Sequence, residues 1–339
     1  MELLGIDIGG ANLKAASQAG WCAHQHFPLW RQPDRLAQAI RQLIDAAPQC
    51  SRVAATMTGE LADCFRTKAE GVRWIVDALV EAAGDREVRI YHTDGMLAPP
   101  KLTREHPEMA AASNWHALAR YVGTLFARGP VLLTDLGSTT CDLIPLIDGR
   151  LAARGSTDLE RLRSGELVYT GASRTPICSL VTHLPYGDEL LPIARELFAT
   201  TLDAYLMLGR LPECAADTCT ADGRPATHEF ARDRLARMLC LDHDAYAMHD
   251  AMRAAWHIES AQVQEIVGAM NRAIESMPSP RLLVISGEGE FLLQKAISSS
   301  AGRYVWAELE TISLAAKLGS ELSRCAPAFA VAQLAESDW

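Results

Sequence analysis

The sequence lacks a surplus of basic residues, a long apolar run and a paired-cysteine motif. Its 32 Lys and Arg are outnumbered by 42 Asp and Glu, and no basic cluster forms the stripe that a nucleic-acid backbone requires. No apolar run approaches the ~18 residues of a membrane span, and the N-terminus lacks the regions of a signal peptide. We therefore expect no nucleic-acid binding and no membrane insertion.

The cysteines and histidines do not form metal motifs. None of the nine cysteines belongs to a C-x-x-C pair, so we expect reduced, mostly buried thiols in a cytoplasmic protein. Cys214 and Cys219 have no second pair, which disfavours zinc, and His243 and His249 do not share one helical face. Solvated helix ends are the favoured interpretation of the two histidines. G-x-S-x-G and Walker A motifs are also missing, which excludes two common nucleophile and phosphate sites.

The length and the segment pattern predict an α/β protein with two domains. A chain of 339 residues exceeds the size at which one hydrophobic core usually keeps growing. Gly129-Pro130 breaks the chain, so we predict an N-terminal domain over 1–128, a C-terminal domain over 129–325 and a tail over 326–339. We also predict a helix over 188–208, and a last helix within 312–325 that is free to pack back on the first domain.

The most informative stretch is an apolar strand that ends in Asp7 and is followed by Gly9, Gly10 and a polar turn. Glycines can take positive φ and let backbone N–H groups approach an anion, and a carboxylate at a strand end can hold a divalent cation. The same pattern recurs over residues 131–142, with Asp135 and Gly137 in the matching places. We interpret the chain as an internal duplication.

Aligned on their acidic residues, the two hairpins predict a two-sided phosphate site. Asp7 and Asp135 would share Mg²⁺, which offsets the repulsion between carboxylates and phosphate. The side chains of Asn12, Ser138, Thr139 and Thr140 could instead form hydrogen bonds within their own turns. The residues expected to bind phosphate are Gly9, Gly10, Asn12, Lys14, Gly137, Ser138, Thr139 and Thr140, with Gly287, Glu288 and Gly289 after a later strand.

Further polar residues stand on loops after predicted strands. Glu60 suits a base or an amine partner and Arg174 suits a carboxylate or phosphate, so both are candidates for substrate binding. A structural ion pair is the alternative for each of them. The predicted catalytic residues are Asp7, Lys14, Glu60 and Asp142. A general base could be Asp142, Glu60 or Asp7, and the residue pattern does not rank them.

These motifs together resemble those of the acetate kinase, sugar kinase, hsp70 and actin superfamily. Within it, the chain resembles the hydantoinase/oxoprolinase-related proteins of one-carbon, tetrahydromethanopterin-linked pathways. The resemblance implies two ribonuclease-H-like domains with a cleft between them. The motifs that carry it span residues 5–14, 56–61, 113–115, 134–140, 169–171, 174–176, 220–225 and 286–289.

The resemblance also implies an activity, because this family is similar to a synthase of methanofuran biosynthesis. Such a transferase joins an aminomethylfuran methyl diphosphate to a phenol, either γ-glutamyltyramine or a tyrosine-type phenol as in methylofuran, and releases diphosphate. The reaction implies Mg²⁺ and needs no ATP. The partners would be small-molecule substrates, and the oligomeric state stays open, a homodimer included.

Two other functions compete with this one. An ATP-dependent kinase or a hydantoinase/oxoprolinase-like hydrolase would use ATP in the same two hairpins, with residues 286–289 around the adenosine. A non-catalytic regulator would bind a nucleotide without turning it over, and it would need a partner surface. A synthase should bind diphosphate with magnesium and ignore adenine.

Overall fold

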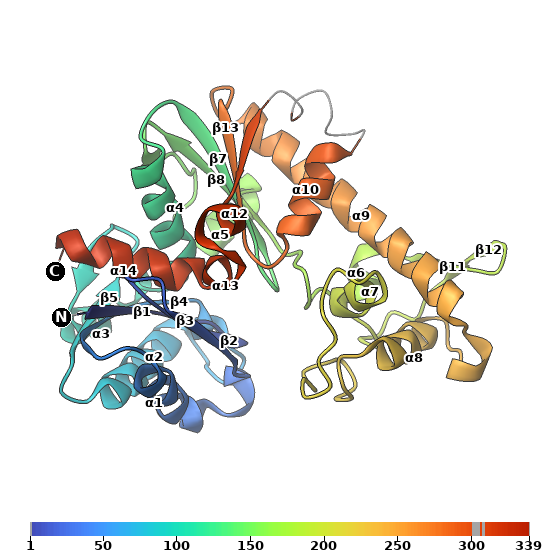
Figure 1. The fold of residues 1–339 in the computed structure, drawn as a ribbon, viewed down its shortest axis with the longest axis horizontal. Coiled ribbons are helices and arrows are strands. Elements are labelled where there is room, and N and C mark those ends of the chain that lie inside the picture. The colour runs from blue at the N-terminus through green and yellow to red at the C-terminus, as the bar shows by residue number, and fades with distance from the viewer. Residues whose placement is uncertain (1, 300–305, 307–308, 339) are drawn as a thin grey trace. The chain divides into compact units, whose positions relative to one another are not determined.

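The computed structural model describes residues 2–299, 306 and 309–338 (Figure 1). The chain divides into two compact units. The first comprises 1–133, 144–164 and 312–339, and the second comprises 134–143 and 165–311. This division differs from the predicted boundary, since residues from both later segments pack on the first unit. At Gly123, for example, a Cβ would lie 2.2 Å from the carbonyl oxygen of Gly149.

The sheet of the first unit has the strand order β3-β2-β1-β4-β5-β6. The first three strands pair antiparallel, whereas β1, β4 and β5 run parallel, so the chain reverses in a hairpin before it crosses over. The strand bounds are β1 (Glu2–Ile8), β2 (Asn12–Ser17), β3 (Cys22–His26), β4 (Cys50–Met57), β5 (Glu87–Tyr91) and β6 (Leu97–Ala98).

Alternation along β1 directs its side chains to two layers of helices. Leu4, Ile6 and Ile8 belong to one buried cluster with residues of α1 (Leu36–Ala46) and α2 (Lys68–Ala83). Leu3 belongs to another, with residues of α4 (Asn114–Leu125) and α14 (Ala326–Asp338). Successive side chains of a strand point to opposite faces, so both faces of this sheet are covered. Asp7 shares the register of Leu3.

The segment predicted as a tail, 326–339, is largely helical. Its helix α14 lies against β1 and α4, and a Cβ at Gly5 would come within 2.0 Å of the carbonyl oxygen of Ala328 (Figure 1). The prediction overlooked it because the helix is rich in alanine and is buried on most sides, so it has no polar stripe to mark its period.

The second sheet has the order β10-β8-β7-β13-β14, with β9 paired to β8. Strand β7 lies at its centre. On one side it pairs with β8, the next strand in the sequence, and on the other with β13, a strand from much later in the chain. The strand bounds are β7 (Pro130–Leu136), β8 (Cys141–Ile147), β9 (Arg150–Leu151), β10 (Leu167–Val168), β13 (Leu282–Ser286) and β14 (Glu310–Ser313).

The helix predicted over 188–208 is wrong for most of its length. Strands β11 (His183–Tyr186) and β12 (Glu189–Pro192) form a hairpin there, and only α7 (Thr201–Met207) is helical. Gly187 takes a φ of +55° at the hairpin turn, and at the start of α7 the Thr200 backbone N–H donates to Asp203 Oδ2 over 2.9 Å. The apolar spacing of this stretch therefore comes from two kinds of element and not from one helix.

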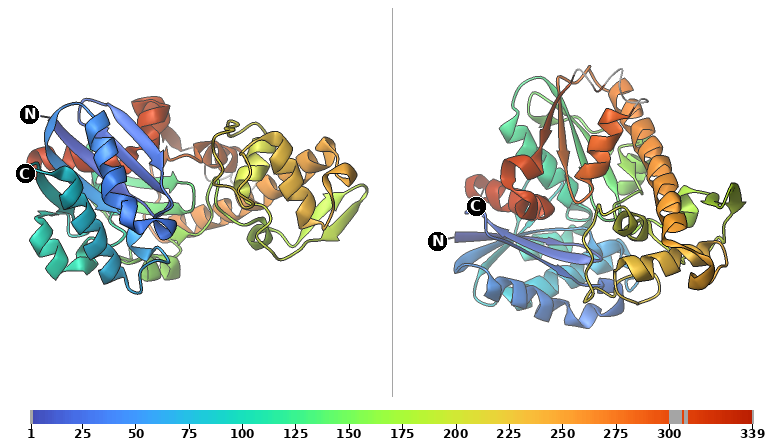
Figure 2. Two further views of the ribbon diagram at one scale, coloured as in Figure 1. Left: turned by 90° about the horizontal axis from the view of Figure 1, so that it is seen from below. Right: turned by 45° about the vertical axis from the view of Figure 1, so that its right-hand side comes forward.

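Helix α9 (Met248–Glu275) is the long helix of the second unit, and α10 (Glu290–Ser298) lies alongside it in both views of Figure 2 and in Figure 1. The remaining helices are α3 (Pro100–Glu105), α5 (Asp158–Ser164), α6 (Ile177–Leu180), α8 (His228–Met238), α12 (Leu314–Leu318) and α13 (Ser320–Arg324), with 3-10 turns η1 (Leu29–Arg31), η2 (Pro33–Arg35), η3 (Gly59–Leu61), η4 (Pro107–Met109) and η5 (His243–Ala245).

Two further predictions concern membrane and thiols. Among the residues that the structure describes, no helix combines the length and apolarity that crossing a bilayer requires. The nine cysteines are free thiols, but only three are fully buried, and Cys214, Cys219 and Cys240 are exposed. The prediction of mostly buried thiols was therefore wrong for the loops around α8, where polar neighbours leave the cysteines at the surface.

Candidate functional site

The first predicted hairpin joins β1 to β2. The Gly9 N–H donates to the carbonyl oxygen of Asn12 over 3.0 Å, and this bond closes the turn. Neither Gly9 nor Gly10 takes the positive φ that we predicted. Glycine is needed at position 9 for close approach, since a Cβ there would lie 2.9 Å from the Asn12 oxygen, whereas a Cβ at Gly10 would meet no atom within 4 Å. The turn is tight on one side and open on the other.

Asp7 is a buried acid at the base of this hairpin. It pairs with Lys14 across β1 and β2, is only 4% exposed, and its Oδ1 has no hydrogen-bond partner. Burial raises the pKa of Asp7 to about 6, against the opposing charge of Lys14. A buried carboxylate oxygen without a partner is costly, so this atom is available to a cation or a proton donor.

The second hairpin, between β7 and β8, repeats the closure of the first. The Gly137 N–H donates to the carbonyl oxygen of Thr140 over 2.9 Å, in the place of the bond from Gly9 to Asn12. Asp135 stands two residues before Gly137, as Asp7 does before Gly9, and Gly137 also lacks a positive φ. The duplication predicted from sequence is thus a duplication of backbone geometry.

Two loops of the second unit pack on the second hairpin. The loop after β10 donates from the Arg174 N–H to the carbonyl oxygen of Ser138 over 2.9 Å, and a Cβ at Gly171 would lie 2.4 Å from that same oxygen. The side chain of Arg174 is exposed, although desolvation by its surroundings lowers the pKa of its guanidinium. The predicted residue Arg174 and the predicted turn 137–140 therefore belong to one assembly.

The predicted glycines after β13 pack on the same hairpin from another direction. Gly287 has a φ of +98°, and a Cβ on it would lie 2.3 Å from the Leu136 oxygen and 2.9 Å from Asp135 Oδ1. The Gly289 N–H donates to that Leu136 oxygen over 2.8 Å, and Glu288 stands between the two glycines. Both glycines are required by contact with β7, whatever ligand they also meet.

A buried polar network that the sequence did not reveal supports the loop at Thr170 and Gly171. Gln262 of α9 donates from Nε2 to Thr170 Oγ1 over 3.0 Å and to the Gly171 oxygen over 2.9 Å. Tyr205 donates to the Gln262 side chain, and Thr201 donates to the Gly171 oxygen over 2.9 Å. A glutamine among the apolar positions of α9 was the one signal that could have found this network.

Glu60 occupies the turn η3 directly after β4, beside the first hairpin. β1 and β4 are parallel, so their carboxyl ends meet at one edge, and the Thr58 N–H donates to the Ile8 oxygen over 3.0 Å. Glu60 is 1% exposed, and its Oε2 has no hydrogen-bond partner. The predicted residues Asp7 and Glu60 are thus brought to neighbouring strand ends.

Several groups hold the Glu60 carboxyl in place. The backbone N–H of Ala112 acts on it and lowers its pKa, and Ala112 is a non-glycine residue with a φ of +48°. Helix α2 packs directly on the backbone of Glu60, since a Cβ at Gly71 would lie 2.4 Å from the Glu60 carbonyl oxygen. Lys68 Nζ is 4.0 Å from Glu60 Oε1 and donates to Asp158 Oδ2 over 2.7 Å. The sequence did not point to Lys68, Ala112 or Asp158.

Burial is the main reason that the pKa of Glu60 is raised. It raises the pKa of Glu60 to about 7, and Asp158 acts in the same direction. Lys68 and the backbone N–H groups of Ala112 and Glu60 lower it. Near neutral pH this carboxyl can therefore exist in both protonation states.

The Ser113-Asn114-Trp115 motif follows Ala112 and is anchored to β4. Ser113 Oγ lies 2.8 Å from Thr56 Oγ1, and the Ser113 N–H donates to the Met57 oxygen over 3.0 Å. The guanidinium carbon of Arg161 lies 3.9 Å from the centroid of the Trp115 ring, and both side chains are almost fully buried. This stacked pair ties α5 to α4 in the first unit.

Of the remaining residues considered in the sequence, Asp142 adjoins the second hairpin turn, whereas the histidines and cysteines do not. Asp142 is buried on β8, opposite Leu167. His243 and His249 are exposed and pair with their neighbouring aspartates, Nε2 of His243 lying 2.8 Å from Asp244. Cys214 and Cys219 are exposed, and within the described ranges no set of three or more His, Cys, Asp or Glu side chains could hold a metal ion.

The oxygen ligands at the first hairpin show whether the site suits Mg²⁺. The buried Oδ1 of Asp7 fits a hard cation, and Mg²⁺ usually takes only one or two carboxylates beside water and substrate phosphates. Asp7 and Asp135 belong to different units, so a shared ion stays a prediction. The residues fit the metal, with Asp7 as its best-formed ligand.

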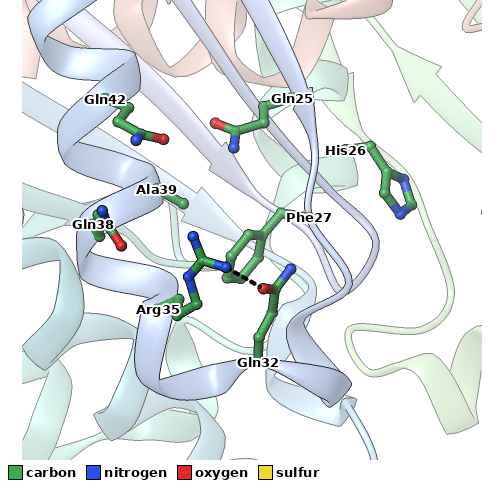
Figure 3. A pocket seen from close by; sticks show the side chains of 8 residues that line it. All are labelled: Gln25, His26, Phe27, Gln32, Arg35, Gln38, Ala39 and Gln42. Carbon is green, nitrogen blue, oxygen red and sulfur yellow. Dashed lines mark hydrogen bonds between the residues drawn. The ribbon is translucent and has the colours of Figure 1, made fainter. Parts of the chain in front are cut away.

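Two cavities contain none of the predicted residues. One, of about 220 Å³, lies between β3 and α1, where the Arg35 guanidinium donates to Gln32 over 3.3 Å beside three further glutamines (Figure 3). The other, of about 470 Å³, is lined by residues of α9 and α10 with Trp256 and Lys295 among them. The candidate site does not coincide with either cavity, and its residues lie at strand ends and in turns.

Comparison with known proteins identifies the family. The hydantoinase/oxoprolinase family model matches residues 52–338. A protein of Methanocaldococcus jannaschii named (4-{4-[2-(gamma-L-glutamylamino)ethyl]phenoxymethyl}furan-2-yl)methanamine synthase is 33% identical over 98% of this chain and 97% of its own. A Methanococcus vannielii protein of the same name is 31% identical over 61% of this chain and 91% of its own.

Solved structures show the fold. Nucleotide-free acetone carboxylase, from a study of ATP-dependent acetone carboxylation, covers 97% of this chain with 70% of its own at a TM-score of 0.53 and 12% identity. The predicted fold class, with ribonuclease-H-like domains of the actin, hsp70 and sugar-kinase type, is confirmed. The chain belongs to the hydantoinase/oxoprolinase family, in the branch that contains the phenoxymethylfuran methanamine synthases.

Proposed function

We propose that the chain is a transferase that joins an aminomethylfuran methyl diphosphate to a phenol, forming an aryl ether and releasing diphosphate. The observation that carries the proposal is the end-to-end similarity to a synthase whose name describes such a phenoxymethylfuran. The phenol of that product bears a γ-glutamylaminoethyl group, so γ-glutamyltyramine is the first acceptor to test, and a tyrosine-type phenol is the second.

The chemistry divides into holding the diphosphate and aiming the phenol. The furylmethyl carbon can bear developing positive charge, so the bond to diphosphate breaks once negative charge on the leaving group is stabilised. The turns 9–12 and 137–140, with Lys14, would bind the diphosphate. Mg²⁺ held by Asp7 and Asp135 would supply charge neutralisation at its oxygens.

The glycines of the hairpins support this assignment. Gly10 leaves space beside the first turn, and the partly exposed Ser138, Thr139 and Thr140 present hydroxyl groups at the second. Successive backbone N–H groups in such turns are suited to anions. Arg174 and the turn 287–289, which pack on the second hairpin, would complete that side of the phosphate site.

The test is incubation with the furan methyl diphosphate, a phenolic amine and Mg²⁺, with diphosphate and ether measured together. We expect both products in equal amounts without ATP. An ATP-dependent kinase or hydrolase would instead require ATP for turnover. A regulator would bind nucleotide and form no product. Release of no diphosphate with any phenol, together with ATP turnover, would contradict the proposal.

A further inference from the structure

We propose that Glu60 is the general base of this transferase, and that its Oε2 takes the phenolic proton as the ether bond forms. This inference rests on the proposed function. The sequence offered Asp7, Glu60 and Asp142 as candidates for the general base without ranking them, and the structure favours Glu60. Lys68 and Asp158, which do not touch the reacting atoms, act as positioning residues for Glu60.

Glu60 has a buried carboxylate oxygen without a partner. Glu60 is 1% exposed and its Oε2 makes no hydrogen bond. Burying a carboxylate oxygen without a partner costs free energy that folding alone does not repay. Such an atom is available to a donor from outside the chain, and a phenolic O–H is such a donor.

A strained residue and a close helix contact surround the Glu60 turn. Ala112 adopts a φ of +48°, a left-handed conformation that is strained for an alanine, and its backbone N–H lowers the pKa of the Glu60 carboxyl. Gly71 permits contact between α2 and the Glu60 backbone that a Cβ would prevent at 2.4 Å. Two unrelated segments therefore fix the same turn.

Two charged side chains of opposite sign act on the Glu60 carboxyl. Lys68 and Asp158 are the charged side chains that act on Glu60, one from α2 and one from α5. The Lys68 ammonium group is 2.7 Å from Asp158 but 4.0 Å from Glu60, so it is bonded to the aspartate and only moderates the glutamate. The resulting pKa of about 7 suits a base that works near neutrality.

The other acids fit different roles. Asp7 lies on the phosphate hairpin beside Lys14, where a carboxylate that holds a cation must stay ionised. Asp142 is the second residue of β8 and directly follows the second hairpin turn, opposite Leu167, so it belongs to the side assigned to the diphosphate. Glu60 stands at a strand end, next to the first hairpin and outside it, where a phenol can approach the carbon that carries the diphosphate.

The proposed step exchanges one carbon–oxygen bond for another. The phenolic oxygen forms a bond to the furylmethyl carbon, and the bond from that carbon to the diphosphate oxygen breaks, its electron pair leaving with diphosphate. The phenolic proton moves to Glu60 Oε2 and is released to water before the next turnover. No oxidant, reductant or ATP takes part.

The experiment compares Glu60→Gln with the wild type over phenols of decreasing pKa. We expect a loss in kcat of about 10²- to 10⁴-fold with an unsubstituted phenol, and a smaller loss with nitrophenols, which need less help from a base. Glu81→Gln, an exposed change on α2, is the matched control. Thermal unfolding checks that each variant is folded.

A second pair of variants keeps the inference testable if Glu60→Gln does not fold. Activity of the wild type should fall below pH about 7, because a protonated Glu60 cannot accept a proton. Lys68→Met removes a cation and should move this limb to higher pH. Asp158→Asn removes an anion and should move it to lower pH.

Three results would overturn the assignment. The limb could stay in place in both variants, or Glu60→Gln could keep the wild-type rate and pH profile. An equal loss for every phenol with a raised KM for the furan substrate would mean that Glu60 holds the aminomethyl group instead. A wild type that releases no diphosphate would refute the proposed function itself, which is a separate outcome.

Discussion

Lys68 Nζ lies 2.7 Å from Asp158 Oδ2 and 4.0 Å from Glu60 Oε1, so the lysine is bonded to the aspartate and leaves the buried glutamate incompletely paired. Glu60 is therefore an acid that the fold holds at a cost. Burial raises the pKa of Glu60 from the ordinary value of 4.5 to about 7 for the same reason.

Replacing Glu60 should stabilise the protein at alkaline pH. Because the folded-state pKa is raised, its contribution to stability is full below pH about 4.5 and is lost as the pH rises through about 7. Glu60→Gln avoids this loss, and the gain at pH 8 is on the order of 3 kcal/mol at most. Thermal unfolding at pH 4.5 and pH 8 checks it. A Tm difference that does not grow with pH would contradict the pKa assignment.

Gly71→Ala should destabilise the protein and impair catalysis together. Its Cβ would lie 2.4 Å from the Glu60 carbonyl oxygen, so α2 or the turn must shift, at a cost of about 1–3 kcal/mol. Gly268→Ala in α9 is the control, because its Cβ would meet only Arg272 at 3.5 Å. That change should stabilise by up to about 1 kcal/mol. Denaturant unfolding compares them, and equal effects would refute the contact.

Gly10→Ala should separate ligand binding from folding. A Cβ at Gly10 meets no protein atom within 4 Å and its φ is not positive, so the free energy of unfolding should change by less than about 0.5 kcal/mol. If diphosphate approaches this turn, its affinity should fall at least about tenfold, a loss of ~1.4 kcal/mol. Calorimetric titration with Mg²⁺-diphosphate measures it. Unchanged affinity would remove Gly10 from the phosphate site.

Asp7→Asn should abolish the response to magnesium without unfolding the chain. Asp7 is buried with a pKa raised to about 6, so a neutral amide should be tolerated, and it should gain stability over the wild type as the pH rises through 6. Transferase activity and diphosphate binding would lose their Mg²⁺ dependence. Retention of a normal Mg²⁺ titration would show that the ion is held elsewhere.

The fold and the two hairpins could be predicted from sequence because their signals are local. An apolar strand, an acid and a glycine at fixed spacing specify a turn, and the bonds from Gly9 to Asn12 and from Gly137 to Thr140 confirm it. The reason given for Gly9 was wrong, since close approach and not positive φ requires it. Spacing alone does not distinguish these two causes.

The surroundings of Glu60 could not be predicted, because they depend on tertiary contacts. Lys68 is 8 positions from Glu60 and Asp158 is 98 positions away, and each resembles an ordinary surface residue in the sequence. The strain at Ala112 has no sequence signal, since alanine rarely marks a left-handed position. Helix α14 was missed for a related reason, because its small buried residues gave no amphipathic period.

The central claim is that the bond broken lies between carbon and oxygen. An ¹⁸O label placed on the oxygen that bridges the furylmethyl carbon and the diphosphate tests it directly by mass spectrometry. We predict that the label leaves with diphosphate while the phenolic oxygen enters the ether. Label retained in a furylmethyl alcohol would show attack at phosphorus, as in a kinase or phosphatase, and would contradict the account.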